Sequence, residues 1–328
     1  MFAFDYLRPA SLDAAIAAAA SSDACFIGGG TNLLDLMKSG VARPARLVDV
    51  NHLELDRIER LPDGGLRIGA AARNSDVADH QLVRTNYPLL SQALLAGASP
   101  QLRNMATVGG NLLQRTRCDY FVDPGFRQCN KRDPGSGCAA RSGLNRMHAV
   151  LGASIHCVAV NPSDMNLALV VLGASLNVRG ADGARSIPID QFHRLPGDHP
   201  EQDTTLRRGE LIVSVDLPPS AYARHCHYLK VRDRASFAFA LVSVAVGLDV
   251  AAGTIRSGRI ALGGVAHKPW YAQRASEALS GKSAASLDGV AIAAQALEGA
   301  QPLAQNAYKI PLARNAVSRA LKHALETA

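Results

Sequence analysis

The chain has few aromatic side chains, modest charge and no long hydrophobic run, and each shortage excludes a class of protein. Aromatic residues make up 5% of the 328 residues and charged residues 19%. No run approaches the ~18 consecutive apolar residues that span a bilayer, so we expect no transmembrane helix. The alanine-rich stretch at 14–20 lacks a basic leader, so we expect no signal peptide. An apolar content of 48% over this length indicates a soluble globular protein with room for two domains.

The formal net charge of +7 would suit nucleic-acid binding, but its distribution favours another use. Eight basic residues and only three acids fall between Arg103 and Arg146, a stretch that also holds several cysteines. No motif of alternating aromatic and basic residues accompanies them, so we expect no nucleic-acid partner. Positive charge in this stretch would instead compensate thiolates and phosphates.

The cysteines lack the close pairing that is typical of zinc sites. Four of the six lie within 40 residues, separated by ten, eight and eighteen residues: Cys118, Cys129, Cys138 and Cys157. Structural zinc sites usually contain two cysteines separated by two to four residues, and this chain has no such pair. An iron–sulfur cluster, disulfides and unligated thiols are all compatible with the spacing. Cys25 and Cys226 are expected to be ordinary buried or half-buried side chains.

The apolar pattern predicts an α+β protein of two domains. Pro218-Pro219 marks the boundary, which gives a first domain at 1–220 and a second at 221–328, with the cysteine segment at 115–157 inside the first. Neither a helical nor an alternating period survives from 118 to 143, and a run this long is usually functional or disordered. Predicted helices cover 14–20, 33–40, 77–95 with a break at Pro88, 164–172, 284–297 and 312–326. Predicted strands cover 23–27, 47–50, 66–70, the approach to Gly109, 175–178, 211–217, 227–231, 240–250 and 255–262, and order also resumes at 156–160.

Two glycine segments resemble each other and suit the binding of an anion. The first, residues 26–34, contains three successive glycines before Thr-Asn-Leu-Leu, and the second, residues 107–113, contains two before Asn-Leu-Leu. Glycines let backbone N–H groups converge on one anion, and the positive end of a following helix adds to the attraction. Two such segments suit a diphosphate held from two sides, whereas a turn that binds nothing is the alternative for the first alone. Neither segment is a P-loop or a Rossmann fingerprint.

No set of side chains predicts a catalytic centre on this chain. His267 follows a glycine turn, but a catalytic base needs a partner and the sequence indicates none. His148 and His156 lie near the cysteines and are either nitrogen ligands or ordinary polar residues. We therefore predict no catalytic residue.

The chain resembles the FAD-binding subunits of molybdenum-containing hydroxylases, the xanthine oxidase family, and among them the periplasmic aldehyde oxidoreductase type. The matching segments follow in order along nearly the whole chain: 26–36, 94–98, 102–113, 115–118, 129–132, 134–138, 162–165, 230–244 and 262–270. The resemblance implies an α+β fold in which a two-subdomain FAD-binding domain (vanillyl-alcohol-oxidase or PCMH-like) precedes a C-terminal flavoprotein domain. One departure is Gly28, where relatives often have alanine.

The resemblance also implies which residues contact the cofactors. The glycine segments would hold the FAD diphosphate, Asp164 would place an acid on the cofactor, and Lys230 would lie near the flavin ring. The implied FAD-binding residues are Phe26, Ile27, Gly28, Gly29, Gly30, Thr31, Asn32, Leu33, Thr107, Gly109, Gly110, Asn111, Asp164, Ile212 and Lys230. Most relatives lack the cysteine segment, and the aldehyde oxidoreductase type uses it for a [4Fe-4S] cluster. The implied ligands are Cys118, Cys129, Cys138 and Cys157.

The same resemblance implies a heterotrimer. A large molybdenum-cofactor subunit would oxidise an aldehyde, a small [2Fe-2S] subunit would pass on the electrons, and FAD on this chain would deliver them to an external acceptor. The alternatives are a self-contained flavin oxidase of the same fold and a non-catalytic binder of zinc and nucleic acid. The resemblance implies the periplasm, reached by co-export with a signal-bearing partner, whereas the missing leader alone indicates the cytoplasm.

Overall fold

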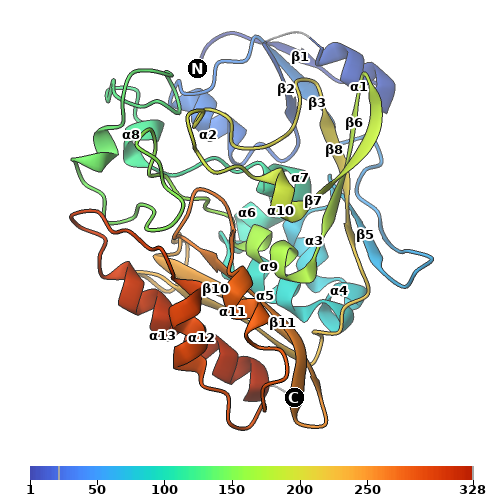
Figure 1. The fold of residues 1–328 in the computed structure, drawn as a ribbon. Coiled ribbons are helices and arrows are strands. Elements are labelled where there is room, and N and C mark those ends of the chain that lie inside the picture. The colour runs from blue at the N-terminus through green and yellow to red at the C-terminus, as the bar shows by residue number, and fades with distance from the viewer. Residues whose placement is uncertain (21–22, 327–328) are drawn as a thin grey trace.

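Three β-sheets follow one another along the molecule, with helices packed between and beside them (Figure 1). The structure, a computed structural model, describes residues 1–20 and 23–326. The cysteine segment, drawn in green, lies along one side of this stack (Figure 1). Within the described residues, no helix combines the length and the apolar character needed to cross a membrane.

The first sheet is small and parallel, with the strand order β1-β3-β2. Ser11 caps its first helix by accepting a hydrogen bond from the Ala14 N–H, so this helix begins two residues before the predicted range of 14–20. The elements are β1 Asp5–Leu7, α1 Leu12–Ala18, β2 Ala24–Ile27, α2 Leu33–Lys38 and β3 Arg46–Asp49. The first glycine segment leaves β2 and enters α2, so it lies at the carboxyl edge of this sheet.

The second sheet has five antiparallel strands in the order β4-β5-β8-β6-β7. A group of short helices shares one hydrophobic core with it. The elements are β4 Ile58–Arg60, β5 Leu66–Gly69, α3 Asn74–Asp79, α4 Gln81–Asn86, α5 Pro88–Ala96, α6 Pro100–Met105, α7 Val108–Leu112, α9 Asp164–Leu172, β6 Ser175–Gly180, β7 Gly183–Pro188, α10 Ile189–Phe192 and β8 Leu211–Leu217.

Helix α9 lies in the middle of the molecule and is buried along its whole length (Figure 1). The Ser163 side chain accepts a hydrogen bond from the Asn166 N–H at its start, and Gly173 ends it in the left-handed conformation (φ 68°). The helix packs between α5 and the strands β10 and β11 of the third sheet. This packing fixes the position of Asp164, the first residue of the helix.

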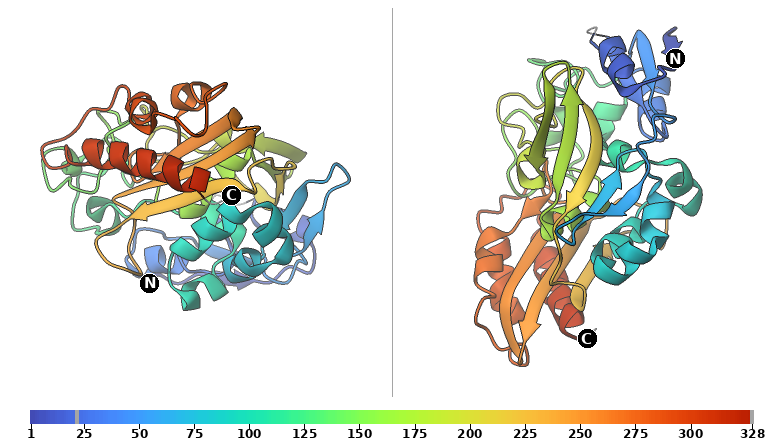
Figure 2. Two further views of the ribbon diagram at one scale, coloured as in Figure 1. Left: turned by 90° about the horizontal axis from the view of Figure 1, so that it is seen from below. Right: turned by 90° about the vertical axis from the view of Figure 1, so that its right-hand side faces the viewer.

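The third sheet is antiparallel, with the order β12-β11-β10-β9, and forms a separate hydrophobic core with the last helices. Figure 2 shows the C-terminal helix, in red, lying across its strands. The buried residues of that helix recur at helical spacing: Ala313, Ala316, Val317, Ala320, Leu321 and Ala324. The elements are β9 His225–Val231, β10 Val242–Ala251, β11 Thr254–Gly263, β12 Trp270–Tyr271, α11 Gln273–Glu277, α12 Gly289–Ala296 and α13 Lys309–Glu326.

The α+β class is confirmed, and the differences from the predicted elements have local causes. The approach to Gly109 is a helix, α7, because the Thr107 side chain caps it, so the prediction of a strand there is wrong. Residues 156–160 form neither helix nor strand. The predicted helix at 77–95 consists of α3, α4 and α5, because His80 and Tyr87 leave the helical conformation. The cysteine segment is largely irregular, as predicted, with only α8 (Asp119–Val122) and a 3-10 turn (Ala139–Arg141).

Candidate functional site

The two glycine segments lie directly against each other. A Cβ atom added at Gly29 would lie 1.8 Å from the Met105 carbonyl oxygen, and one at Gly28 would lie 2.8 Å from the Thr107 Oγ1. The first distance excludes any side chain, because its neighbour is backbone and cannot rotate away. Glycine at position 29 is therefore what allows the two backbones to approach.

The first segment keeps its backbone donors free. Gly30 adopts a left-handed conformation (φ +72°), which turns the chain into α2. Within the described residues, the N–H groups of Gly29, Gly30, Thr31 and Asn32 have no hydrogen-bond acceptor. The Asn32 side-chain nitrogen is also buried and unpaired, while its Oδ1 accepts from the Arg115 N–H at 3.1 Å. Converging unpaired donors of this kind form an anion cradle.

The second segment is built differently despite its similar sequence. The N–H groups of Val108 and Gly109 donate to carbonyls just before α3, at 3.0 and 2.8 Å, and the Gly110 N–H donates to the Thr107 hydroxyl at 3.2 Å. These amides are therefore not available to a ligand. The segment instead presents the Asn111 side chain, whose Oδ1 accepts from the Ser163 hydroxyl at 2.7 Å. The two segments are thus adjacent but not equivalent.

A cavity of about 890 Å³ opens beside the first segment and extends to the start of α9 and the loop after β9. This volume falls in the range of ~300–1,000 Å³ that is usual for small-molecule sites. Its apolar wall includes Leu94, Met165 and Phe239. The predicted cofactor residues on the wall are Thr31, Asn32, Gly110, Asn111, Asp164 and Lys230.

The other predicted residues do not line this cavity. They are Phe26, Ile27, Gly28, Gly29, Gly30, Leu33, Thr107, Gly109 and Ile212. Most belong to the two glycine segments and support the cavity wall from behind. Ile212 is buried in β8 as part of the core of the second sheet.

Asp164 and Lys230 form a buried ion pair on the cavity wall. Lys230 Nζ lies 2.7 Å from Asp164 Oδ2, and the two side chains are 4% and 9% exposed. The Tyr228 hydroxyl donates to the other carboxylate oxygen. Burial, with this carboxylate beside it, raises the pKa of Tyr228 well above its usual range, so the phenol stays protonated. The wall at this point is polar but balanced in charge.

Arg117 lies on the cavity wall and is not among the predicted binding residues. In the described part of the chain it makes no hydrogen bond or salt bridge, and its guanidinium carbon lies 5.3 Å from the centroid of the Phe239 ring. Burial lowers the pKa of this guanidinium without neutralising it. A half-buried cation that makes no salt bridge, with Asp35 as the acid near it, suits a cavity that receives phosphate groups. The basic excess in the sequence is the signal that pointed to this region.

The four clustered cysteines surround one small void in the cysteine segment. Cys118, Cys129, Cys138 and Cys157 all line it, together with Lys131. Cys129 and Cys138 face each other across an isolated antiparallel bridge, which the Asn130 N–H to Gly137 carbonyl bond (2.7 Å) supports. All six cysteines of the chain are free thiols. Cysteines that are up to 39 positions apart in the sequence therefore line one void.

Of the four cysteines that line this void, Cys129 and Cys157 are buried and Cys118 and Cys138 are half-buried. Burial raises the pKa of Cys118 to about 12 and that of Cys157 to about 11, although Lys131 acts against the shift at Cys157. No group of three or more His, Cys, Asp or Glu side chains in residues 1–20 and 23–326 is placed to share one metal ion. His148 Nε2 lies 3.1 Å from Cys118 Sγ, whereas His156 faces Asp198 at 3.4 Å.

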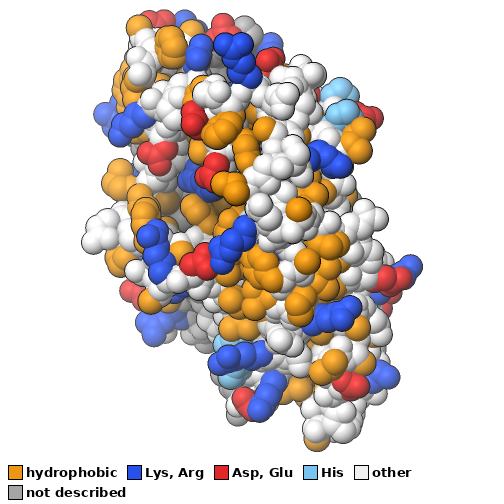
Figure 3. Space-filling model, turned by 90° about the vertical axis from the view of Figure 1, so that its left-hand side faces the viewer, with side chains coloured by type: hydrophobic (Ala, Val, Ile, Leu, Met, Phe, Trp, Pro, Cys, Tyr) orange, Lys and Arg blue, Asp and Glu red, His pale blue; other side chains and the backbone are white. Residues whose placement is uncertain are grey.

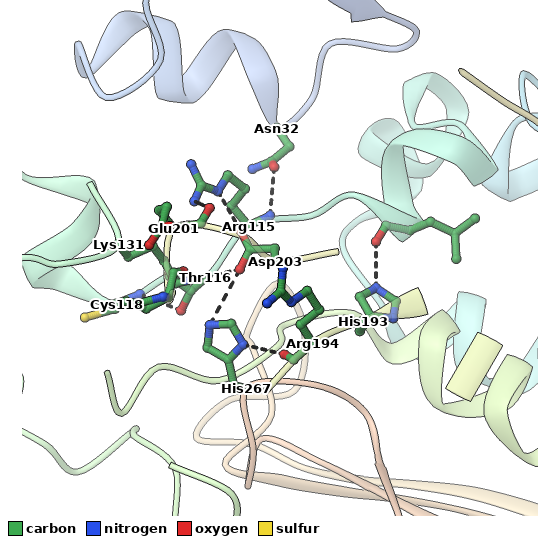
Figure 4. Close-up of polar contacts among 12 residues, drawn as sticks. Asn32, Arg115, Thr116, Cys118, Lys131, His193, Arg194, Glu201, Asp203 and His267 are labelled. Atoms are coloured by element: carbon green, nitrogen blue, oxygen red, sulfur yellow. Dashed lines mark hydrogen bonds and ion pairs between the residues drawn. The ribbon is translucent and has the colours of Figure 1, made fainter. Parts of the chain in front are cut away.

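A buried charge network fixes the cysteine segment to the rest of the protein (Figure 4). Lys131 Nζ lies 2.5 Å from Asp203 Oδ1, and Arg115 Nε donates to Asp203 Oδ2 at 2.8 Å. Burial alone would raise the pKa of Asp203, but Lys131 and Arg115 hold it below its usual range. His267 is the fourth member, with Nδ1 donating to the Arg194 carbonyl at 2.8 Å. Burial lowers the pKa of His267 to about 4, so it is a neutral structural residue here.

The surface around the cysteine segment carries both signs of charge. Figure 3 shows this side of the molecule, where basic and acidic side chains are interspersed between hydrophobic ones. Arg146 pairs with Asp233 through two bonds of 2.8 and 2.9 Å, and Arg132 donates to the backbone carbonyls of Tyr120 and Phe121. These two arginines are therefore bonded within the chain, Arg146 at the surface and Arg132 to backbone carbonyls.

Models of two protein families match nearly the whole chain. The FAD binding domain in molybdopterin dehydrogenase matches residues 2–220, and the CO dehydrogenase flavoprotein C-terminal domain matches residues 227–324. Together they account for the three sheets and the helices described above.

Individual relatives cover the chain from end to end. The aldehyde oxidoreductase FAD-binding subunit PaoB of Escherichia coli (strain K12) is 50% identical over 328 residues, which is 99% of each chain. The glyceraldehyde dehydrogenase medium chain of Sulfolobus acidocaldarius is 26% identical and covers 85% of this chain and 82% of its own. Among solved structures, quinoline 2-oxidoreductase from Pseudomonas putida 86 superposes with a TM-score of 0.75 at 27% identity, covering 99% of this chain and 98% of its own. Carbon monoxide dehydrogenase from Hydrogenophaga pseudoflava gives a TM-score of 0.76 at 25% identity, covering 100% and 99%.

Proposed function

The chain belongs to the FAD-binding subunits of the molybdenum hydroxylase family, and from that premise we propose that it is the FAD- and [4Fe-4S]-carrying electron-transfer subunit of a molybdenum-dependent aldehyde oxidoreductase. The observation that carries the proposal is the 890 Å³ cavity with an anion cradle at one end and a buried ion pair at the other. The 50% identity to an aldehyde oxidoreductase subunit selects the aldehyde class.

The residues of the cavity divide the work of holding FAD. The free N–H groups of Thr31 and Asn32, which line the cavity, and the unpaired side-chain amide of Asn32 would bind the diphosphate, with Arg117 supplying positive charge. The apolar wall would exclude water from the flavin ring. Lys230 would lie beside that ring, oriented by its bond to Asp164. When bound, FAD accepts electrons singly and releases them in pairs, which suits a junction between iron–sulfur centres and an acceptor.

The four-cysteine void would hold the [4Fe-4S] cluster. Four sulfurs around one buried void supply the Cys₄ ligand set that such clusters need. The spacing of the cysteines, with no two separated by only two to four residues, argues against zinc. The Lys131 ammonium beside the void would offset part of the negative charge of four thiolates.

The proposed complex contains two further subunits. A large molybdenum-cofactor subunit would oxidise the aldehyde, a small [2Fe-2S] subunit would feed electrons to this chain, and an external acceptor would remove them. We place the complex in the periplasm, exported together with a signal-bearing partner. Fractionation of cells that express all subunits tests this placement, because recovery in the cytoplasmic fraction alone would contradict it.

Cofactor content tests the proposal directly. The full-length chain purified without its partners should hold one FAD and about four iron atoms. Replacing Cys129 by serine should remove the iron, whereas replacing Cys226, a buried cysteine outside the void, should not. Stoichiometric FAD with trace iron in the unaltered chain would contradict the cluster.

Anaerobic addition of aldehyde separates this function from that of a self-contained flavin oxidase. The isolated chain should keep its oxidised flavin spectrum, because substrate oxidation occurs on a partner subunit. The co-purified complex should bleach under the same conditions. Bleaching of the isolated chain would favour the oxidase.

A further inference from the structure

A histidine contacts one of the four cysteines of the void. His148 Nε2 lies 3.1 Å from Cys118 Sγ, and the imidazole is buried. Its other nitrogen, Nδ1, is buried and has no hydrogen-bond partner. The only polar contact of the ring, within the described residues, is therefore to the sulfur. Buried polar groups are usually hydrogen-bonded, so a buried imidazole with a single polar contact must be held in position by the packing and bonding of its backbone.

A segment of the C-terminal domain holds the backbone around His148. Residues 301–309, which precede and begin α13, donate a hydrogen bond to every backbone carbonyl from 146 to 150. The bonds run from Tyr308 Oη to Arg146 O (3.1 Å), Lys309 Nζ to Met147 O (2.8 Å), Asn306 Nδ2 to His148 O and Ala149 O (3.1 Å each), and Gln301 N to Val150 O (2.7 Å). The backbone that carries His148 is held on both sides of the ring.

The donors of this segment are themselves costly to bury. Asn306 and Lys309 are fully buried. No salt bridge is recorded for Lys309 in the described part of the chain, and its ammonium also donates to the Gly264 carbonyl at 2.7 Å. An ammonium buried without an acidic partner is expensive unless its donors are satisfied. Burial, with the nearby Arg146 acting in the same direction, lowers the pKa of Lys309 to about 7, and the acceptors of its amine are the carbonyls of Met147 and Gly264.

The chemistry of the contact follows from what the sulfur becomes when it binds iron. A metal ligand is a thiolate, which has no proton to give and only accepts hydrogen bonds. The imidazole must then present Nε2–H to Cys118 Sγ. Hydrogen bonds to the sulfurs are among the features that set the reduction potential of an iron–sulfur cluster. A donor stabilises the more negative, reduced state and so raises the potential.

We propose that His148 is a positioning residue that donates a hydrogen bond to the Cys118 thiolate and raises the reduction potential of the cluster, with the 301–309 segment holding it in place. The inference rests on the proposed [4Fe-4S] cluster. It assigns a role to a contact between the two domains, since the C-terminal domain would adjust a cofactor bound by the N-terminal one.

The test is a redox titration of the full-length chain, followed by EPR of the reduced cluster. His148→Phe keeps a ring of similar size but removes the donor, and should shift the cluster midpoint to a more negative potential with iron content and flavin potential unchanged. His148→Gln offers an amide donor near the position of Nε2 and should restore much of the shift. His156→Phe is the matched control, because this ring lines the same void but faces Asp198, and it should leave the midpoint unchanged. Asn306→Ala should move the midpoint in the same direction as His148→Phe.

A measurement on the unaltered chain tests the contact even if the variants fail to bind the cluster. In a chain labelled with 15N-histidine, pulsed EPR of the reduced cluster should detect a histidine nitrogen coupled through the sulfur. A cluster without that coupling, or an equal midpoint in His148→Phe, would overturn this inference and leave the proposed function intact. A wild-type chain without any cluster signal would overturn both.

Discussion

Replacing Asp203 by asparagine removes the charge that joins the cysteine segment to the loop after α10. Asp203 is the only acid bonded to Lys131 and Arg115 in the described residues. The lysine side chain is 1% exposed, whereas the carboxylate retains 26% exposure. Asparagine has nearly the same shape, so the change leaves packing intact and isolates the loss of charge.

The magnitude follows from the ammonium that is left behind. Removing one partner of a buried ion pair usually costs about 3–5 kcal/mol. Because Asp203 is partly exposed, we expect the low end, about 3 kcal/mol, or roughly a hundredfold in the folding equilibrium. The loss of folding free energy has an upper bound of about 5 kcal/mol. A lysine left without its acid can lose its proton instead, and deprotonating a lysine of ordinary pKa at pH 7 costs that amount. Asp216→Asn is the matched control: its partner Arg67 is 41% exposed, so the cost should be about 0–1 kcal/mol.

The assay is denaturant unfolding of the full-length chain and both variants between pH 3 and pH 8. The pKa of Asp203 is lowered in the folded state, so its stabilisation is complete above the unfolded pKa of about 4 and is lost as the pH falls through the folded value. The difference between wild type and Asp203→Asn should therefore be constant from pH 5 to 8 and shrink below about pH 4. Equal losses of unfolding free energy in the two variants would refute the reasoning. So would a difference between wild type and Asp203→Asn that stays constant below about pH 4.

Three further predictions concern the large cavity. Gly29→Ala should abolish FAD binding, because the added Cβ would clash with a backbone carbonyl. Gly28→Ala should retain FAD, because its Cβ would contact a threonine side chain that can change rotamer. Flavin absorbance of the purified chains distinguishes the two variants. Arg117→Met should weaken FAD binding about tenfold or more, because it removes a cation that makes no salt bridge. Fluorescence titration of the deflavinated chain measures the affinity. An unchanged affinity would contradict the role of Arg117 in binding phosphate. Lys230→Met leaves the Asp164 carboxylate buried without its cation and should lower the free energy of unfolding by about 3–5 kcal/mol, while Lys230→Met combined with Asp164→Asn should recover part of it. A double variant no more stable than the single one would show that the pair is not coupled.

Elements with complete local signals could be predicted from the sequence. Helix α9 has a serine cap before it, an unbroken apolar run and a left-handed glycine after it, so its bounds coincide with the predicted 164–172. The long strand β10 is largely apolar and rich in valine, and the predicted strand at 240–250 overlaps its observed bounds. The resemblance of the glycine and cysteine segments to those of a known family identified the regions that the structure brings to one cavity and one void.

Features that depend on distant partners could not be predicted. The sequence of α7 predicts a strand that approaches a glycine turn, but the segment is helical: the Thr107 side chain caps it, and its first amides bond to carbonyls before α3. Asp203 lies 72 residues from Lys131 in an irregular loop, so nothing marked it as the counter-ion. The same holds for Lys309, whose acceptors are backbone carbonyls without any sequence signature. Tertiary contacts between irregular segments decide these cases.

The cysteine segment is anchored at two places by buried lysines, and the two anchors differ in kind. Lys131 lies inside the segment and reaches outward to an acid, whereas Lys309 lies outside and reaches inward to the backbone. Separating the segment from the rest of the protein would break the Lys131–Asp203 ion pair and the Lys309 hydrogen bond to the Met147 carbonyl together. Arg117 and Cys118 are consecutive residues, and the first lines the large cavity while the second lines the void. Moving the cysteine segment at either lysine would therefore shift Arg117 and Cys118 together, because a single peptide bond joins them. The geometry of the cysteine void and that of the cavity thus depend on each other.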